Sequence, residues 1–479
     1  MASVTIHERP NLGFPLAGPV RDRPWDRHWG PGSLLPPALF LLTAGASLLL
    51  YRQAALVPDL RKVAPQFLLY FGLLFLLYLA AVALVLHAEK IHGPHTPRTW
   101  LVIVLVSAVA FRVMLLPTRP TLSDDIYRYV WDGRVQAAGI SPYRYAPSAS
   151  PLAFLRVNDS TIWRYINRKT AITIYPPAAQ IAFWAIYRVH ADSITWTKTA
   201  LTLAELSALA PLALWLRRQS LSLLRLLILA WSPLAIFEVA GNGHMDALVL
   251  APLVIAWLAF EGRRPTLLGV SLGVATLLKL YPVLFFPLLW TRRDVKAPLA
   301  FVSTLAAGYA LFIGRGGSVL GFLPTYLNER FNAGPAALLA QGLQAIGGPD
   351  MAPWRVVQTW QLLFLGLLAA WALWRPLPQP SVVRRRGWAV IAVFMLLSQN
   401  LFSWYVLMIL PLLTLDLRGG RWGLRLDAAT GWLLFTGLVA LSYTFFMTWD
   451  PVPWAIWAQY GTLLLFLAAH AWRQGSAHC

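Results

Sequence analysis

Apolar runs of membrane-spanning length recur along the whole chain and constrain its fold more than any other feature. A helix needs about 20 consecutive apolar residues to cross the hydrocarbon core of a bilayer. Runs near this length are frequent, and 58% of all residues are hydrophobic. We therefore predict an all-α fold, a polytopic transmembrane helix bundle of about 11–14 spans, and exclude a soluble protein. The candidate spans are residues 35–50, 66–88, 100–117, 174–190, 197–216, 221–238, 246–261, 266–290, 297–314, 356–374, 387–416 (counted as two), 429–447 and 453–472.

The basic residues mark the cytoplasmic ends of these spans. A net charge of +20 would point to nucleic acid in a soluble domain. Here Arg217-Arg218 and Arg263-Arg264 lie in short links between apolar runs, as the positive-inside rule predicts. We therefore expect no nucleic-acid partner and a multi-pass protein of a membrane, with a bacterial plasma membrane as the expected location. The single cysteine, Cys479, excludes an intramolecular disulfide.

Two polar insertions, residues 118–172 and 315–355, interrupt the apolar pattern. The first is rich in arginine, yet long loops are translocated largely regardless of charge. Its amphipathic segments suit helices that lie in the membrane interface. The expected division is a disordered basic cytoplasmic tail (1–33), N-terminal membrane helices (34–117), a first large non-cytoplasmic loop (118–172), a core transmembrane module (173–314), a second polar loop (315–355) and C-terminal transmembrane helices (356–479).

The orientations of the spans are consistent only if two of the candidate segments do not cross the membrane as single straight helices. The link "FEVAGNGHMDA" has no Lys or Arg and lies between two arginine pairs, which places it on the non-cytoplasmic side. The direction of the preceding span then requires that residues 174–190 do not cross completely. The same reasoning predicts that 266–290 breaks at "KLYP", residues 279–282, because prolines interrupt helices.

The densest polar cluster begins at "SDDIYRYVWD". We expect Ser123 to be the N-cap of a helix with Asp124 and Asp125 in its first turn, where acids favour the helix dipole. On that helix Asp124, Tyr127 and Arg128 share one face. A cap and a solvated face would explain these residues without any chemistry, so the pair alone leaves a catalytic role open.

Two ionisable residues fall inside apolar runs, Glu205 and Lys279. Charges at such positions are costly and usually face a cavity or a counter-charge. Glu205 could simply pair with a neighbouring helix. Lys279 is the stronger functional candidate because a helix break beside it implies a non-lipid environment, although snorkelling to the interface is the alternative. In "AGNGHMDA", His244 and Asp246 have no third ligand nearby, so a zinc site is not expected.

An ordered series of motifs resembles the GT-C superfamily of integral-membrane glycosyltransferases, in particular the polyprenyl-phosphate-mannose-dependent enzymes. The most similar patterns are those of the catalytic subunit of GPI mannosyltransferase I and the actinobacterial mannosyltransferases of phosphatidylinositol mannoside synthesis. The motifs are, in order, "SDDIYRYVWD", "GISPY", "TIYPP", "GNGHMDALV", "KLYP", "RFN" and "SQNLFSWY". Together they span roughly residues 120–410.

The resemblance implies a catalytic acid on the first large non-cytoplasmic loop and transfer of mannose from a polyprenyl-phosphate donor to a lipid or glycan acceptor, with inversion. Asp124 would be the base, with Asp125 beside it. Lys279, Arg330 and Arg128 would receive the departing phosphate. The remaining motif residues would contact substrate: Tyr127, Tyr175, Asn242, His244, Asp246, Tyr281, Asn332, Gln399, Trp404 and Tyr405. No cofactor is implied, and adjacent acids diverge on a helix, which disfavours a jointly chelated metal.

Two other classes stay open. A transporter or flippase of a lipid-linked or anionic substrate would also need buried Lys and Glu, but transporters usually show two related halves. Here the polar density lies in one loop, which favours the enzyme. A catalytically silent scaffold would tolerate loss of Asp124. Arabinosyl and glucosyl relatives share the architecture, so the sugar and the acceptor are not fixed by the motifs.

Overall fold

The computed structural model describes residues 35–95, 97–157, 161–290, 294–314, 317–348, 351–374, 379–420 and 423–476. The expected tail (1–33), Arg292-Arg293 and Cys479 lie outside the described residues. Within those ranges the regular structure is almost entirely helical. The strands are β1 (Gly419–Gly420) and β2 (Gly423–Leu424), one short antiparallel pair. The predicted all-α fold is confirmed.

The helices follow the predicted spans closely. The first half contains α1 (Leu35–Ala55), α2 (Ala64–His92), α3 (Arg98–Leu115), α4 (Asp125–Ala137), η2 (Ser150–Arg156), α5 (Ile162–Tyr165), α6 (Pro177–Val189), α7 (Ile194–Ser207), α8 (Leu209–Arg218), η3 (Leu223–Leu226), α9 (Leu227–Ala230), α10 (Pro233–Ala235), η4 (Ile236–Gly241) and α11 (Ala247–Glu261). The second half contains α12 (Pro265–Leu278), η5 (Tyr281–Phe285), α13 (Phe286–Leu289), α14 (Lys296–Ala310), α15 (Leu323–Tyr326), α16 (Gly334–Gly347), α17 (Pro353–Trp374), α18 (Pro380–Leu396), η6 (Ser403–Ile409), α19 (Leu410–Asp416), α20 (Ala428–Leu438), η7 (Val439–Thr444), α21 (Phe445–Thr448), α22 (Pro453–Ile456), η8 (Trp457–Gly461) and α23 (Thr462–Gly475).

Six helices of the described chain are long and apolar enough to cross a membrane: Ala38–Ala55, Ala64–Ile91, Arg98–Leu115, Ile194–Arg218, Pro353–Trp374 and Ala428–Thr448. A further pair, Leu223–Ala230 and Pro233–Gly241, is bent by 47° and could form one span. Three shorter apolar helices accompany them, Ala247–Glu261, Pro265–Leu278 and Ser403–Asp416. The protein is therefore a polytopic membrane protein, and the larger number of about 11–14 spans stays a prediction.

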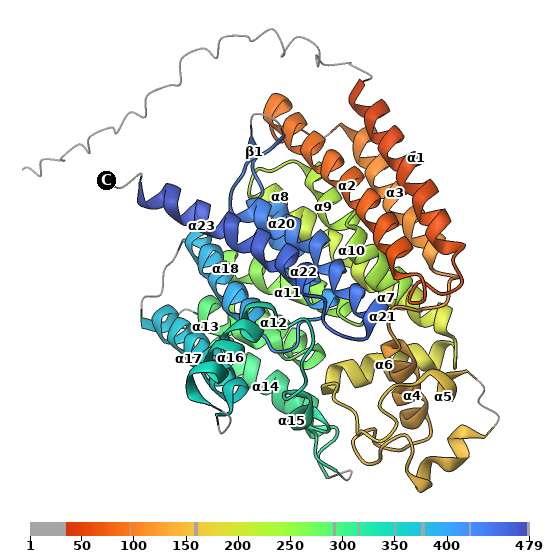
Figure 1. Ribbon diagram of the computed structural model, residues 1–479. Coiled ribbons are helices and arrows are strands. Elements are labelled where there is room, and N and C mark those ends of the chain that lie inside the picture. Colours follow the sequence, from red (N-terminus) through yellow and green to blue (C-terminus); the bar gives the residue numbers. More distant parts are fainter. Residues whose placement is uncertain are drawn as a thin grey trace, which may run out of the picture.

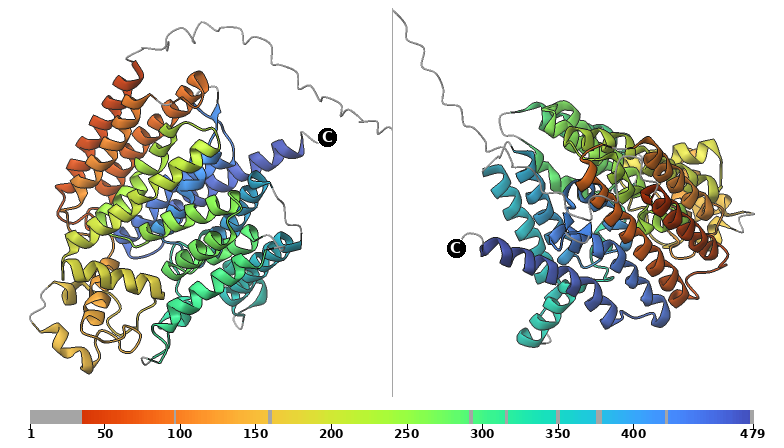
Figure 2. Two further views of the ribbon diagram at one scale, coloured as in Figure 1. Left: turned by 180° about the vertical axis from the view of Figure 1, so that it is seen from behind. Right: turned by 90° about the horizontal axis from the view of Figure 1, so that it is seen from above.

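The bundle has two chemically different ends. Figure 1 shows α4, α5, α6 and α15 together at one end and β1 at the other, and Figure 2 gives the same division from behind. At the β1 end, Arg384 pairs with Glu261 at 3.2 Å and with Asp416 at 3.3 Å. Arg225 pairs with Glu89 there at 2.7 Å. The segments that bear Arg225 and Arg384 therefore lie at the end of the bundle opposite α4, α5, α6 and α15.

The segment 174–190 behaves as the span count requires. Its helix α6 has 13 residues, about 20 Å at 1.5 Å per residue, which is too short to cross about 30 Å of hydrocarbon. It packs against α4 so closely that a Cβ on Gly133 would lie 2.7 Å from the carbonyl oxygen of Phe183. The helix belongs to the insertion end of the molecule.

The predicted break in 266–290 is confirmed. Helix α12 ends at Leu278, and Lys279 has extended backbone angles (φ −149°, ψ 140°) before η5 begins. A Cβ on Gly269 would touch Ala297, and one on Gly308 would touch Leu277, so contacts between α12 and α14 advance in the same direction. These two helices are thus parallel, and η5 with α13 must carry the chain back between them.

A buried ion pair fixes the core between α3 and α7. The guanidinium of Arg112 donates from Nε to Glu205 at 2.9 Å and from Nη2 at 2.5 Å, and both side chains are 1% exposed. Nη1 of Arg112 also donates to the carbonyl oxygens of Ala108 and Ala230. Glu205 therefore pairs with a neighbouring helix, the simpler of the roles considered for it.

Replacing Glu205 with Gln should destabilise the protein strongly. The change leaves the Arg112 guanidinium charged and buried without a counter-ion, which costs about 3–5 kcal/mol of unfolding free energy. The measurement is the Tm of the purified protein in detergent. Asp192→Asn is the matched control, because Asp192 pairs with Arg134 at 2.6 Å while 46% exposed, and such a pair is worth about 1 kcal/mol or less. Equal Tm values for the two variants would contradict the assignment.

Candidate active site

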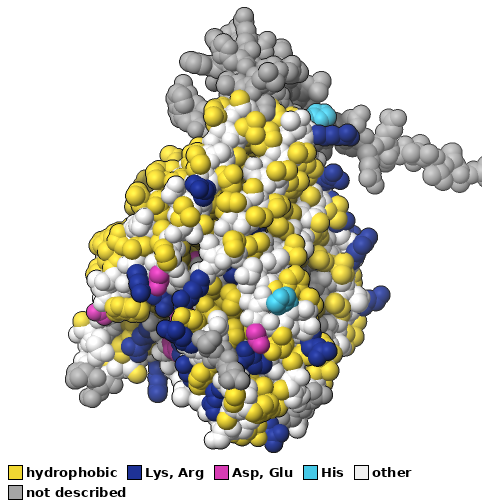
Figure 3. Space-filling view, turned by 90° about the vertical axis from the view of Figure 1, so that its right-hand side faces the viewer, with side chains coloured by type: hydrophobic (Ala, Val, Ile, Leu, Met, Phe, Trp, Pro, Cys, Tyr) yellow, Lys and Arg dark blue, Asp and Glu magenta, His cyan; other side chains and the backbone are white. Residues whose placement is uncertain are grey.

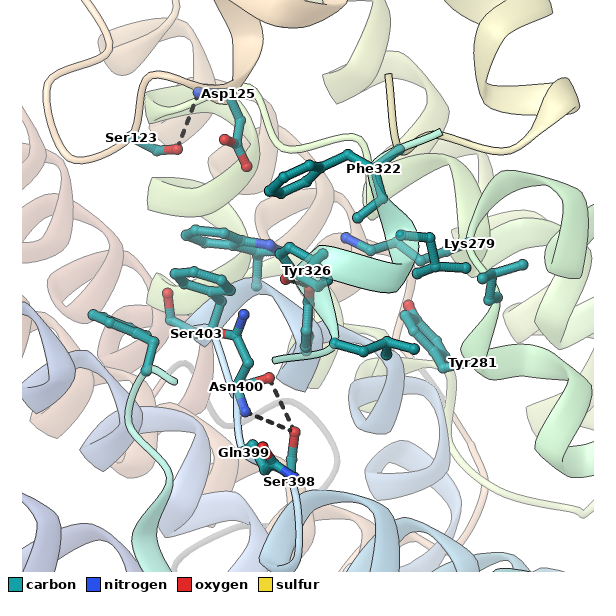
Figure 4. Close-up of a pocket in the computed structure, with 18 of the residues that line it drawn as sticks. Ser123, Asp125, Lys279, Tyr281, Phe322, Tyr326, Ser398, Gln399, Asn400 and Ser403 are labelled. Carbon is teal, nitrogen blue, oxygen red and sulfur yellow. Dashed lines mark hydrogen bonds between the residues drawn. The ribbon is translucent and has the colours of Figure 1, made fainter. Parts of the chain in front are cut away.

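A cavity of about 740 Å³ opens where the 118–172 insertion meets the bundle. Its lining comes from the start of α4, the stretch before α6, the break after α12, α15, the link between α18 and η6, and η7 with α21. Figure 4 shows Asp125 and Lys279 directed toward this space, with Tyr326 between them and Ser398, Gln399, Asn400 and Ser403 below them. Segments far apart in the sequence thus converge on one hollow.

Asp125 is the first residue of α4 and one quarter of its side chain is exposed. The Nδ2 group of Asn167 donates a hydrogen bond to its Oδ1 at 2.7 Å. Burial raises the pKa of Asp125 above its ordinary value, against the opposing influence of that hydrogen bond and of the Lys279 ammonium. A carboxylate with a raised pKa that still reaches the cavity has the properties of a general base.

Asp124 lies beside it but is engaged differently. Two guanidinium nitrogens of Arg61 donate to its carboxylate at 3.0 and 3.3 Å, and Nε of Arg61 donates to the carbonyl oxygen of Thr121 at 2.8 Å. The expected cap is displaced by one residue: Asp124 is the N-cap of α4 and its side chain makes no cap hydrogen bond. The Ser123 hydroxyl accepts from the Asp125 N–H at 3.3 Å instead.

Lys279 provides the central cation of the cavity. Its Nζ lies 2.8 Å from Oδ2 of Asp246, which is fully buried, and 4.4 Å from the centre of the Tyr405 ring. The side chain of Lys279 is 17% exposed. Because α12 ends just before it, Lys279 leaves the helix and turns into the cavity. Snorkelling is therefore not its role.

Two arginines extend the positive charge along the insertion side. Arg128 donates from Nε to Asp132 at 2.8 Å and from Nη1 to the carbonyl oxygen of Ala171 at 3.0 Å, so its position is fixed. Arg168 pairs with Glu329 and lies 5.2 Å from the ring of Phe322. Both arginines line the cavity together with Arg61 and Lys279. Figure 3 shows Lys and Arg side chains gathered over the lower part of the molecule, below a largely hydrophobic surface.

The sequence motifs meet in this cavity only in part. The predicted residues that line it are Asp124, Asp125, Arg128, Tyr175, Lys279, Tyr281, Gln399, Trp404 and Tyr405. His244 and Asp246 are fully buried one layer behind that wall. Tyr405 contacts the hydroxyl of Tyr326, and Gln399 donates to the carbonyl oxygen of Trp354 at 3.0 Å.

Besides His244 and Asp246, four predicted residues do not reach the cavity lining. Arg330 lies 4.6 Å from the ring of Trp354 and faces that ring. Tyr127 packs on Tyr165 at a ring distance of 5.3 Å. The remaining two hold loops together: Asn242 accepts from the Leu122 N–H at 3.3 Å, and Asn332 donates to Gln459 at 3.0 Å.

Several lining residues escaped sequence reasoning. They are Arg61, Asn167, Arg168, Tyr326, Ser403 and Tyr443. Arg61 lies in the short polar link between the first two helices, which by itself reads as an ordinary loop. Asn167 and Arg168 belong to the polar insertion but fall outside its recognisable motifs. The parts of the chain that the structure describes contain no group of three or more His, Cys, Asp or Glu that could hold a metal ion.

Comparison with protein families identifies the class. A helical membrane bundle with an acid and several cations in one cavity fits a membrane-embedded transferase. Residues 41–292, more than half of the chain, match the model of the MptA_B family, described as alpha-(1->6)-mannopyranosyltransferase, N-terminal domain. The chain belongs to this family and is a mannosyltransferase of the membrane. Neither the curated proteins nor the solved structures yielded a match.

The matched region contains only part of the cavity. Asp125 and Lys279 lie inside it, whereas Gln399, Trp404 and Tyr405 lie beyond its end. The C-terminal helices therefore complete a site whose charged residues come from the family region.

Loss of the Lys279 charge should separate folding from activity. In Lys279→Met, Asp246 stays buried without its partner, which lowers the unfolding free energy by about 3–5 kcal/mol. Adding Asp246→Asn removes the orphaned charge and should recover most of this loss. Mannose transfer should stay low in both variants, because the cavity has lost its central cation. The measurements are Tm and transfer of labelled mannose; recovery of activity in the double variant would contradict a direct role for Lys279.

Proposed function

We propose that this enzyme transfers mannose from a polyprenyl-phosphate donor to a hydroxyl group of a lipid or glycan acceptor, on the non-cytoplasmic side of the membrane. The observation that carries the proposal is the pairing of functions in one cavity: an acid with a raised pKa, Asp125, faces the ammonium of Lys279. Such a site can remove a proton from an acceptor and stabilise a departing phosphate.

The lipid character of the donor is supported by the apolar side of the cavity. Leu280, Val283 and Leu284 from the break after α12, Leu362 and Leu365 of α17, and Phe394 of α18 all line it. Helix α17 is mostly exposed on the surface of the molecule: only 11% of its most apolar stretch is buried. An isoprenoid chain could leave the cavity between these helices and enter the bilayer while its phosphate contacts Lys279. No Gly-rich phosphate loop that follows a strand is present in the sequence, which disfavours a nucleotide-sugar donor.

The proposed reaction is a single inverting displacement. The acceptor oxygen attacks the anomeric carbon on the face opposite the phosphate, while Asp125 takes the hydroxyl proton. The bond between the anomeric carbon and the phosphate oxygen breaks, and its electron pair leaves with the polyprenyl phosphate. Lys279, with Arg128 and Arg168 nearby, stabilises that charge. Inversion at a β-linked donor gives an α-mannoside, in agreement with the linkage in the family description.

Asp125 is preferred to Asp124 as the base. The carboxylate of Asp124 is held by two nitrogens of Arg61, which donate to both of its oxygens. The carboxylate of Asp125 instead accepts a hydrogen bond from the side-chain amide of Asn167, which carries no charge. Asp124 is then the residue that fixes Arg61 and the α1–α2 link at the rim of the cavity.

The non-cytoplasmic location is supported by the two ends of the bundle. The cavity lies at the insertion end, and the links bearing Arg218, Arg225 and Arg384 lie at the other. The positive-inside rule assigns arginine-bearing short links to the cytoplasm. The cavity then opens to the outside of a plasma membrane, where a lipid-linked sugar serves as donor without cytoplasmic nucleotides.

Asp125→Asn should lower the rate of mannose transfer by about 10²–10⁴-fold, the usual contribution of a general base. Asp124→Asn should lower it by less than about tenfold, because it loosens Arg61 without removing the base. Both variants keep the size of the side chain. The measurement is incorporation of labelled mannose from polyprenyl-phosphate mannose by membranes that contain equal amounts of each protein. A larger fall in the transfer rate for Asp124→Asn than for Asp125→Asn would contradict this assignment and identify Asp124 as the base.

Cysteine labelling tests the orientation. Since Cys479 is the single cysteine, Cys479→Ser gives a cysteine-free background. Ser150→Cys, at an exposed position of the insertion end, should react with a membrane-impermeant maleimide on intact cells. Leu426→Cys, 61% exposed at the β1 end, should react only after the membrane is permeabilised. The reverse pattern would place the cavity in the cytoplasm and exclude the proposed donor side.

A further inference from the structure

His244 lies between two carboxylates directly behind the proposed base. Its Nδ1 is 3.9 Å from Oδ2 of Asp125, and its Nε2 is 3.5 Å from Oε2 of Glu238. The side chain is fully buried, and neither ring nitrogen has a hydrogen-bond partner among the residues that the structure describes. Buried polar groups are normally satisfied, so an imidazole poised between two acids requires an explanation.

The backbone holds this histidine rigidly against the start of α4. Glu238 lies in η4, a π-helical turn, and its carbonyl oxygen accepts from the His244 N–H at 2.9 Å. π-helical turns inside α-helices occur frequently at functional sites. Gly243 has φ +75°, and a Cβ there would lie 2.3 Å from Cδ1 of Ile126. Only glycine lets the turn approach α4 this closely, and the approach brings His244 to Asp125.

Glu238, on the side of His244 away from Asp125, is held in place by hydroxyl groups. Ser403 donates to Oε1 of Glu238 at 2.6 Å. The Tyr443 hydroxyl lies 2.8 and 3.0 Å from the two oxygens of Glu238. These contacts hold the carboxylate of Glu238 in place and leave Oε2 facing the imidazole.

The surroundings of His244 suit a ring that is neutral at rest and charged for a short time. Burial lowers the pKa of His244, so the imidazole is neutral at rest. Its ring stacks on Trp404 at 3.7 Å with an interplanar angle of 16°, and an indole face attracts a cation. The charged groups that face it are Asp125 from α4 and Glu238 from η4; the ammonium of Lys279 opposes its protonation but is neutralised by Asp246.

We propose that Asp125, His244 and Glu238 form a proton relay, which rests on the proposed role of Asp125 as the base. Asp125 takes the proton of the acceptor hydroxyl as the glycosidic bond forms and the phosphate departs. When the 3.9 Å between Oδ2 of Asp125 and Nδ1 of His244 closes to hydrogen-bond distance in the substrate complex, the proton passes to His244, and Glu238 stabilises the imidazolium from the other side. When the products leave, the proton returns through Asp125 to water that enters the cavity. His244 and Glu238 act through Asp125 and are positioning residues.

The relay predicts a particular pH dependence. Protonation of either Asp125 or His244 before the reaction blocks it, so the activity falls on the acid side. Below both pKa values the logarithm of kcat should change with a slope of about 2 per pH unit, because two protons must be absent. With His244→Gln only the ionisation of Asp125 remains, and the slope should fall to about 1. A histidine that merely packs in the core would leave the slope unchanged.

The experiment compares purified wild type, His244→Gln, Glu238→Gln and His190→Gln, using polyprenyl-phosphate mannose and a synthetic alkyl mannoside as acceptor. We expect His244→Gln to lower kcat about 10- to 100-fold with the donor KM within about twofold, and Glu238→Gln to lower kcat similarly. His190 is an exposed histidine at the end of α6, and its variant should match wild type in kcat and slope. Tm values establish that each variant is folded.

The outcomes separate the relay from the function on which it rests. Wild-type kcat and slope in folded His244→Gln would overturn the relay. If His244→Gln does not fold, Glu238→Gln provides the test. A wild-type kcat in folded Glu238→Gln would likewise overturn the relay. A wild-type enzyme that transfers no mannose from the polyprenyl-phosphate donor would instead refute the proposed function.

Discussion

The ion pair between Lys279 and Asp246 is the interaction on which the rest of the site depends. A charge is costly within the apolar part of a membrane protein unless a partner compensates it. Asp246, in the turn before α11, compensates the charge of Lys279 at the point where α12 ends. The break in the helix and the counter-charge therefore lie at the same place. The pair also leaves part of the Lys279 side chain free to face the cavity. The residue that follows the end of α12 thus provides a cation for the cavity.

Two neighbouring acids at the start of α4 illustrate how one helix can divide its tasks. Adjacent side chains point in different directions on a helix. Asp124 therefore meets Arg61 from the α1–α2 link, whereas Asp125 meets Asn167 and lies near His244. The first acid binds the insertion to the N-terminal helices. The second retains a raised pKa and access to the cavity, which are the properties required of a base.

The sequence predicted the helices and some of their irregularities, but the site only in outline. The direction of the spans, set by the positive-inside rule, and the positions of prolines predicted the break at Lys279 and the incomplete crossing of 174–190. The acids and Lys279 stood out because charges are rare in such a chain. The contacts of Arg61 and Tyr326 could not be foreseen, since they depend on how distant segments pack. Tyr127 and Asn332 matched motifs, yet packing turned them toward Tyr165 and Gln459.

The central claim is that a polyprenyl phosphate binds with its phosphate at Lys279 and its sugar beside Asp125. The most direct test is an experimental structure of the enzyme with a non-hydrolysable polyprenyl-phosphonate analogue of the mannose donor. We predict a phosphonate oxygen within about 4 Å of Nζ of Lys279, the usual limit of an ion pair, and the lipid chain between η5 and α17. A phosphonate bound at the opposite end of the bundle, near Arg384, would contradict the account.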